Sequence, residues 1–133
     1  MKAIDRMLQQ WRIAEARPWL EPGMRVLDIG CADGALFRLN PGLRDGVGID
    51  PDVAAPQQVG TNLLLPGLFP EALPDHRPFD AITMLAVLEH VPTHLQDRLA
   101  RDCFQAIAPG GHLLITSPRR QPTTSSRCSE ACD

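Results

Sequence analysis

The sequence has no excess of basic residues. Its 13 Lys and Arg residues are outnumbered by 16 Asp and Glu residues, which gives a formal net charge of −3. A protein that neutralises a run of nucleic-acid phosphates needs clustered positive charge. The charge balance therefore excludes a general nucleic-acid-binding module, and we expect no nucleic-acid partner.

The sequence also lacks the cysteine spacing of a zinc site or a disulfide scaffold. Its four cysteines are Cys31, Cys103, Cys128 and Cys132, and no two of them form a C-x-x-C pair. Cys128 and Cys132 are close enough for a metal or redox pair, but no His or Cys stands at ligand spacing to complete it. We interpret them as part of a loose tail and predict no metal site.

No uncharged run approaches the length that crosses a membrane, and the first twenty residues lack the continuous apolar stretch of a signal peptide. These absences predict a cytoplasmic protein without a membrane partner. What remains is ordinary globular composition, with 44% hydrophobic and 22% charged residues. A chain of 133 residues is long enough for one domain with a real core.

The chain begins with a helical pattern. Apolar residues Ile4, Met7, Leu8 and Trp11 recur at the spacing of one helix face, and the pattern ends before Pro18. We expect this stripe, together with Trp11 and Trp19, to pack against the core.

Beyond this helix, predicted strands and helices alternate. Short apolar runs bounded by Gly, Pro or Asp predict five strands, at residues 24–29, 46–50, 62–65, 79–87 and 112–116. Between them, residues 35–39 predict a brief helix and Pro92-Thr93 opens a longer one, with a Thr93…Gln96 capping box. Its apolar face is expected to contain Leu95, Leu99, Phe104 and Ile107. Such alternation indicates a doubly wound α/β fold, a mostly parallel sheet with helices on both faces.

The loop after the first strand is the first candidate for ligand binding, because open parallel sheets bind ligands at the carboxyl ends of their strands. Gly30 and Gly34 allow a sharp turn and a close approach of the backbone, and the following helix offers N–H groups to an anion. Asp28 would repel a pyrophosphate but would suit an ammonium group. Asp50 ends the second strand, where a carboxylate can accept both hydroxyls of a ribose. A nucleoside with an amino-acid end fits this set.

At this point the chain resembles the class I S-adenosylmethionine-dependent methyltransferases. VLDIGCADG is similar to the first motif of that family, GVGIDPD to its second strand, FDAITMLAVLEHV to its fourth and APGGHLLITSP to its fifth. The resemblance spans roughly residues 20 to 118 and is closest to the type 11 and type 12 groups. It implies a Rossmann-like sheet with strand order 3-2-1-4-5 and S-adenosylmethionine as cofactor.

The resemblance also implies roles for individual residues. Asp28, Gly30, Cys31 and Gly34 would line the methionine end of the cofactor, Asp50 would hold the ribose, and Leu68 and Leu85 would flank the adenine. Taken singly, the two glycines also fit a simple turn, Asp28 a helix cap, and Asp50 a strand end. Cys31 is read as a small loop residue rather than a reactive thiol.

His90, just beyond the fourth strand, is the candidate catalytic residue. Its near-neutral pKa suits removal of a proton from a hydroxyl acceptor. The alternative reading is that His90 and its neighbour Glu89 only cap the following loop or helix. We interpret His76, His94 and His112 as surface or packing residues.

The family's sheet normally ends with two further strands, and this sequence shows no strand-like run after residue 118. We therefore expect a partial methyltransferase domain at residues 1–118, a disordered tail at 119–133, and an open sheet edge that a partner chain could complete. Two functions follow: methyl transfer to the oxygen, nitrogen or carbon of a small molecule, or cofactor binding without catalysis as a remnant or partner subunit. A dinucleotide-dependent oxidoreductase is disfavoured, because the loop reads G-x-x-x-G and not G-x-G-x-x-G.

Overall fold

The computed structural model describes residues 2–117. Its helices and 3₁₀ turns are α1 (Ala3–Ala16), η1 (Arg17–Trp19), α2 (Ala35–Leu39), η2 (Leu88–His90) and α3 (Thr93–Ala106). Its strands are β1 (Val26–Ile29), β2 (Val47–Ile49), β3 (Gln57–Val59), β4 (Asn62–Leu65), β5 (Phe79–Leu85) and β6 (Ile107–Thr116). The segment 119–133, predicted to be a disordered tail, lies outside the described residues.

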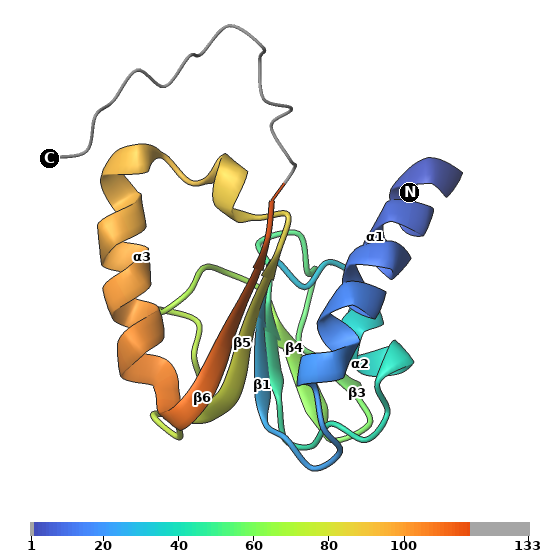
Figure 1. Cartoon of the computed structure of the whole chain (residues 1–133), viewed down its shortest axis with the longest axis horizontal. Helices are drawn as coiled ribbons and strands as arrows, with labels where there is room; N and C mark the ends of the chain where they lie inside the picture. Colours follow the sequence, from blue (N-terminus) through green and yellow to red (C-terminus); the bar gives the residue numbers. More distant parts are fainter. Residues whose placement is uncertain (1, 118–133) are drawn as a thin grey trace, which may run out of the picture.

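The strands form one sheet in the order β3-β4-β2-β1-β5-β6. All neighbouring pairs are parallel except β3 with β4, which is antiparallel. The five parallel strands follow the predicted order 3-2-1-4-5, so the doubly wound fold is confirmed. Helices α1 and α2 cover one face and α3 covers the other (Figure 1). This three-layer arrangement buries both faces of β1, and all four of its residues are buried.

Two hydrophobic clusters hold the layers together. On the α1 and α2 side the cluster contains Phe37, Leu36 and Leu64, and on the α3 side it contains Phe79, Ile82 and Cys103. Central strands with buried residues on both sides read in the sequence as continuous apolar runs, which is why they could be recognised. The sheet is the rigid support for any ligand that binds at the carboxyl ends of its strands.

The sixth strand was not predicted. β3 is only three residues long and pairs with β4 through a tight hairpin, in which Val59 stands opposite Asn62. Its two glutamines are exposed, so it has no apolar periodicity that a sequence pattern could detect. Strand β6 also begins five residues earlier than expected, at Ile107, and a register shift against β5 accommodates Gly110 at φ 78°.

Helix α3 begins where expected, but its predicted cap and face need correction. Pro92 is the N-cap residue and no side chain caps the helix. Thr93 is already helical, and the Gln96 side chain donates instead to the Val91 carbonyl oxygen at 3.2 Å. Phe104 is 80% exposed, and the buried residue of this turn is Cys103, one position earlier.

Helix α1 is confirmed, but its large apolar stripe faces solvent. Ile4, Met7 and Trp11 are at least 60% exposed, and the buried residues are Ile13 and Ala16. The predicted helical period is therefore confirmed, but the predicted buried face is wrong. The polar side of the helix, opposite the apolar stripe, lies toward the carboxyl ends of the strands. Trp19 is also exposed, with its ring 5.6 Å from that of His112 on β6.

None of the helices within residues 2–117 is long and apolar enough to cross a membrane.

Candidate cofactor site

A cleft of about 620 Å³ lies at the carboxyl ends of β1, β2 and β5. Helix α1, the loop after β1 and the turn after β5 form its walls. Its lining residues come from four segments of the chain: Asp5, Gln9, Arg12, Ile13, Asp28, Gly30, Cys31, Ala32, Leu36, Asp50, Asp52, Leu85, Ala86, Val87 and His90. Its volume is that of a typical small-molecule site. Five of the seven predicted cofactor residues, Asp28, Gly30, Cys31, Asp50 and Leu85, therefore meet at one place.

Gly30 turns the chain out of β1 and forms the floor of the cleft. Its φ is 78°, and a Cβ at this position would stand 2.5 Å from Cγ2 of Val87. Its N–H donates to the Ile49 carbonyl oxygen at 2.8 Å, which fixes the loop to β2. Only glycine satisfies both the backbone angle and the contact with Val87.

Asp28 is the last polar group of β1 before the loop and is only 4% exposed. Its Oδ1 accepts a hydrogen bond from the Thr83 hydroxyl at 2.8 Å. Burial raises the pKa of Asp28 to about 7, the Thr83 hydrogen bond lowers it, and the negative charge of Asp50 raises it further. A cationic group entering the cleft would offset the free-energy cost of burying the charged carboxylate and would keep Asp28 ionised.

Asp50 is held by backbone amides. Its Oδ2 accepts from the Ala32 N–H and its Oδ1 from the Asp52 N–H, each at 2.9 Å. A carboxylate offers about four acceptor positions, so each Asp50 oxygen retains capacity for a hydroxyl group. The side chain is thus fixed in position and still able to bind a ligand.

The two non-glycine residues with unusual backbone angles in this cleft are Ala32, at φ 49°, and Ala86, at φ 60°. Both values lie in the left-handed region, which costs an alanine roughly 1–2 kcal/mol. Ala32 is held by its hydrogen bond to Asp50, and Ala86 donates to both the side chain and the carbonyl oxygen of Thr116. Strain of this kind gathers where a loop must present a defined surface.

The loop offers fewer backbone donors than the sequence suggested. The N–H groups of Gly30 and Cys31 both donate to the Ile49 carbonyl, and that of Ala32 donates to Asp50. These three amides are therefore engaged within the protein, and helix α2 behind them is only five residues long. The predicted anion site depends on the first amides of α2, which begins at Ala35, and it stays a prediction.

Cys31 is a small packing residue, as expected. It is 2% exposed, and a Cβ on Gly48 would stand 2.7 Å from the Cys31 Cβ. Burial, with the nearby charge of Asp28, raises the pKa of the Cys31 thiol to about 12, so the thiol stays protonated and unreactive.

Gly34 does not line the cleft. It caps α2 at φ 79° and is buried, and a Cβ there would stand 2.7 Å from Cδ1 of Leu64. Its role is to let α2 pack closely on the sheet. The second glycine of the motif thus serves the fold, and Gly30 serves the cleft.

Leu68 and Leu85 lie in different clefts. Leu85 lines the cleft described above, whereas Leu68, 65% exposed, lines a second one of about 380 Å³ between the loop after β4 and helix α3. Val87 and His90 line both clefts. The two spaces therefore adjoin across the turn that follows β5.

His90 is exposed and ends the 3₁₀ turn η2, where its N–H donates to the Val87 carbonyl at 2.9 Å. This position at the wall between the clefts matches the expected opening of the site. Glu89 is exposed and lines neither cleft.

Three cleft residues from α1 were not singled out by sequence reasoning. Asp5, Gln9 and Arg12 project from the polar side of this helix, and Gln9 donates to Asp33 Oδ1 at 3.1 Å. Their spacing of four and three residues places them on one helix face. That signal was present, but the larger apolar stripe on the opposite side suggested the reverse orientation.

Residues 3–127 match the methyltransferase domain family. This chain belongs to that family. The resemblance to class I methyltransferases, which use S-adenosylmethionine, is thereby confirmed. Among curated proteins, the methyltransferase domain is 34% identical over 110 residues to the "Ubiquinone biosynthesis O-methyltransferase" of Pseudomonas fluorescens (strain Pf0-1). That alignment covers 75% of this chain and 47% of the relative, so the chain spans about half the length of the relative it matches.

Solved methyltransferases share the fold. CalO1, a methyltransferase of calicheamicin biosynthesis in its SAH-bound form, superposes with a TM-score of 0.64 and 21% identity, covering 88% of this chain and 38% of CalO1. The glycopeptide N-methyltransferase MtfA, complexed with sinefungin, superposes with a TM-score of 0.61 and 16% identity, covering 79% of this chain and 51% of MtfA.

Proposed function

We propose that this domain binds S-adenosylmethionine in the cleft at the carboxyl ends of β1, β2 and β5 and transfers its methyl group to a hydroxyl oxygen of a small molecule. The observation that carries the proposal is the pair of carboxylates, Asp28 and Asp50, that end adjacent parallel strands beside Gly30. Each is fixed by hydrogen bonds within the protein, and each keeps acceptor positions for a ligand.

The amino-acid end of the cofactor fits the inner part of the cleft. Asp28 keeps its Oδ2 for the ammonium group, because its Oδ1 takes the Thr83 hydrogen bond. Arg12 is the arginine among the lining residues and is the candidate partner of the cofactor carboxylate. This assignment replaces the loop amides, which are engaged elsewhere.

The nucleoside end fits the outer part. Asp50 can accept from both ribose hydroxyls without losing its backbone partners. The adjoining 380 Å³ cleft, lined by Ile29, Leu68 and Leu95 among others, offers an apolar surface for a planar base. The bound cofactor would then cross the wall formed by Val87 and His90.

The chemistry requires positioning above all. S-adenosylmethionine supplies a methyl group on a sulfonium, whose neutral leaving group needs no acid. Holding the acceptor in line with that methyl group therefore supplies most of the rate. A hydroxyl acceptor is a weak nucleophile, and His90, exposed at the wall between the clefts, is the residue that we propose removes its proton.

Oxygen is the favoured acceptor atom because the Pseudomonas relative is an O-methyltransferase by name. The alternative is cofactor binding without catalysis by this chain. The two are separated by turnover, since both require the same cofactor cleft.

Calorimetric titration with S-adenosylhomocysteine tests the cleft. We expect micromolar binding by the wild-type chain and at least tenfold weaker binding by Asp50→Asn, since two hydroxyl contacts to a carboxylate each contribute about 1.5–3 kcal/mol. Asp97→Asn, an exposed carboxylate on α3 outside both clefts, is the matched control and should bind as wild type. A folded wild-type chain that does not bind would refute the proposal.

Transfer of a labelled methyl group to a panel of small hydroxyl compounds, with amines as controls, tests the reaction. His90→Gln should lower the rate with a hydroxyl acceptor by roughly 10²–10⁴-fold and leave the affinity for S-adenosylhomocysteine unchanged. Binding with no transfer to any compound would favour the non-catalytic alternative.

A further inference from the structure

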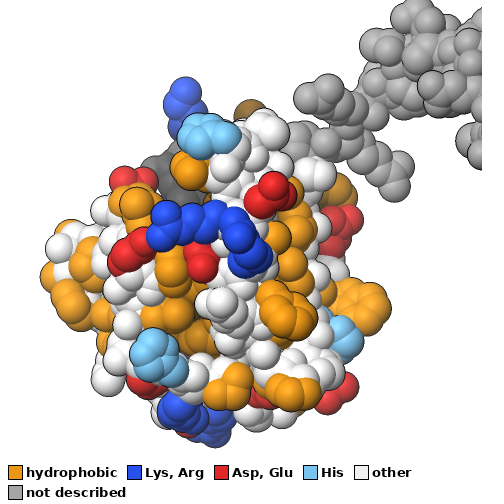
Figure 2. All heavy atoms as spheres, turned by 90° about the vertical axis from the view of Figure 1, so that its left-hand side faces the viewer, with side chains coloured by type: hydrophobic (Ala, Val, Ile, Leu, Met, Phe, Trp, Pro, Cys, Tyr) orange, Lys and Arg blue, Asp and Glu red, His pale blue; other side chains and the backbone are white. Residues whose placement is uncertain are grey.

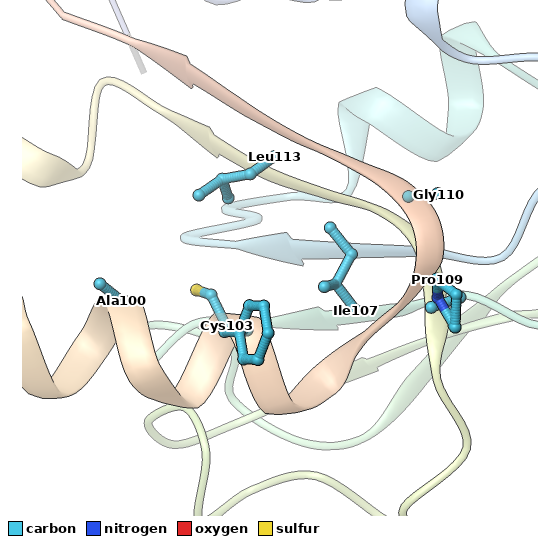
Figure 3. A pocket seen from close by; sticks show the side chains of 9 residues that line it. Ala100, Cys103, Ile107, Pro109, Gly110 and Leu113 are labelled. Carbon is cyan, nitrogen blue, oxygen red and sulfur yellow. The ribbon is translucent and has the colours of Figure 1, made fainter.

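The two faces of the sheet present different side chains. On the α3 side, an apolar groove of about 670 Å³ lies between α3 and β6, and Figure 3 shows Leu113 reaching across it toward Ala100 and Cys103. Charged side chains stand among hydrophobic ones on this face (Figure 2), but none of them lines the groove. Of α1, α2 and α3, it is α1 on the opposite face that brings charged side chains to the cofactor cleft (Figure 1).

Helix α1 is anchored in the core at its carboxyl-terminal end. Ile13 and Ala16 are buried, and both belong to the hydrophobic cluster that contains Leu36 and Phe37. In contrast, none of residues 3–12 is buried. The position of the amino-terminal half of α1 therefore depends on polar contacts.

A hydrogen bond to the loop after β1 provides such a contact. Gln9 Nε2 donates to Asp33 Oδ1 at 3.1 Å, across 24 residues of sequence. Within residues 2–117 it is the one side-chain hydrogen bond that ties α1 to another part of the chain, and neither ion pair of that range involves α1. The amino-terminal half of the helix is therefore held at a single polar point.

Asp33 is a firm partner because it is fixed on its other side. Arg38 of α2 donates to Asp33 Oδ2 at 3.0 Å and also to the Asp33 carbonyl oxygen. The preceding residue, Ala32, is held by Asp50. Burial raises the pKa of Asp33, but hydrogen bonds from Gln9 and Arg38 outweigh this effect and bring the pKa below its usual value. The carboxylate is therefore charged at neutral pH, and a charged acceptor forms the stronger kind of hydrogen bond with an amide N–H.

Arg12 follows Gln9 by three residues on the same face of α1, and it lines the cofactor cleft. The two residues are about 4.5 Å apart along the helix axis, less than one turn, so a hydrogen bond at Gln9 limits the movement of Arg12. Arg12 takes part in neither ion pair of residues 2–117. Its guanidinium group is thus available to an anionic ligand, and its place in the cleft is set through Gln9.

We propose that Gln9 and Asp33 are positioning residues for the cofactor. Their hydrogen bond holds the amino-terminal half of α1 against the loop after β1 and thereby places Arg12 where the cofactor carboxylate binds. This role rests on the proposed function, in which Arg12 is the partner of that carboxylate. Without the bond, the helix must be ordered when the cofactor binds, and the cost of ordering weakens the affinity. The effect is confined to the carboxylate end, because no residue of α1 lines the second cleft, where the base fits.

The test is calorimetric titration of the 133-residue chain with two ligands. One is S-adenosylhomocysteine, and the other is its decarboxylated analogue, which keeps the ammonium group, the thioether and the nucleoside. Gln9→Ala should raise the Kd for S-adenosylhomocysteine roughly fivefold, the effect of one hydrogen bond, and leave the Kd for the analogue unchanged. Gln10→Ala replaces the exposed neighbouring glutamine of the same helix and should bind both ligands as wild type. Asp33→Asn keeps an oxygen that can accept from Gln9 and should give a Kd between those of wild type and Gln9→Ala.

A double-mutant cycle shows whether the hydrogen bond acts through Arg12. Arg12→Gln alone should raise the Kd for S-adenosylhomocysteine roughly tenfold or more, because it removes a charged partner of the carboxylate. Adding Gln9→Ala to Arg12→Gln should change this Kd no further, since the bond then has no guanidinium group to position. Circular dichroism of each variant shows whether it has folded.

Hydrogen exchange of the empty protein reads the position of the helix without any ligand. Amides of residues 7–9 should exchange faster in Gln9→Ala than in wild type, and those of residues 14–16 should not change. A wild type that binds no S-adenosylhomocysteine would refute the proposed function and this role together. If the wild type binds, three results would overturn this role alone: an unchanged Kd in Gln9→Ala, an equal loss of affinity for both ligands, or unchanged exchange at residues 7–9.

Discussion

The Thr83 hydroxyl lies 2.8 Å from Asp28 Oδ1, and both side chains are buried between β1 and β5. Strand pairing sets this contact, because Asp28 and Thr83 are register partners in the parallel sheet. The hydroxyl is the group that favours the ionised form of Asp28 against its burial. Thr83 thus positions the carboxylate that we propose binds the cofactor ammonium.

Thr83→Val should raise the pKa of Asp28 above its value of about 7, because it removes the hydrogen bond that lowers it. Affinity for S-adenosylhomocysteine should fall as pH drops through this pKa, and the variant should shift that midpoint upward. Loss of roughly 1 kcal/mol, the net worth of one hydrogen bond, weakens the Kd about fivefold at neutral pH. Titration over a pH series on both sides of 7 measures this, and Thr83→Ser should restore the wild-type midpoint. An unchanged midpoint in Thr83→Val would contradict the assignment.

Asp28→Asn should stabilise the empty protein at high pH. The folded-state pKa of about 7 lies above the usual aspartate value of 3.8, so between these pH values the folded protein holds the proton that the unfolded chain releases. Its stability contribution is present below 3.8 and is lost as pH rises through 7. Denaturant unfolding above pH 7 should give a higher free energy for Asp28→Asn, and the gain should disappear near pH 4. The same variant should bind S-adenosylhomocysteine at least tenfold more weakly; a variant that is less stable above pH 7 would show that the carboxylate is not strained there.

The sheet could be predicted because its strands are apolar on both faces. Residues 26–29 and 47–49 are short and almost entirely apolar, and their carboxyl ends fix where Asp28 and Asp50 meet. The turn at Gly30 was also predicted from the local sequence. These features depend on short stretches of chain, which is what a pattern of residues reports.

What could not be predicted depends on contacts between distant segments. The period of α1 is visible in the sequence, but its direction is decided by packing of Ile13 and Ala16 on the core. Gly34 was predicted to line the cofactor site because it is the second glycine of the loop motif. In the structure it lies against Leu64, thirty residues away. The sequence does not distinguish the exposed apolar stripe of α1 from a buried one. Nor does it distinguish the polar strand β3 from a loop.

Thr116→Val should weaken cofactor binding through Ala86. Thr116 Oγ1 accepts from the Ala86 N–H at 2.9 Å and helps to hold Ala86 at φ 60° in the wall of the cleft. With that acceptor removed, we expect a roughly two- to fivefold higher Kd for S-adenosylhomocysteine, consistent with about 0.5–1 kcal/mol for one bond. Thr116→Ser should bind as wild type, and Thr93→Val, at an exposed position on α3, controls for loss of a threonine. Equal affinities for the Val and Ser variants would show that the bond does not shape the cleft.

Two glycines with similar backbone angles separate strain from packing. Gly23 has φ +89° and nothing within 4 Å of an added Cβ, whereas Gly34 has φ +79° and Leu64 Cδ1 at 2.7 Å. Gly23→Ala should therefore cost only the backbone term, roughly 1–2 kcal/mol. Gly34→Ala should cost that amount and a further 1–3 kcal/mol for overpacking against Leu64. The difference in free energy of unfolding between the two variants, measured in denaturant, isolates the packing term. Adding Leu64→Val to Gly34→Ala should recover part of it, because the shorter side chain opens space where the new methyl group lies. If the two glycine variants were equally stable, Gly34 would be required for its conformation alone, and the close approach of α2 to β4 would not depend on the missing side chain.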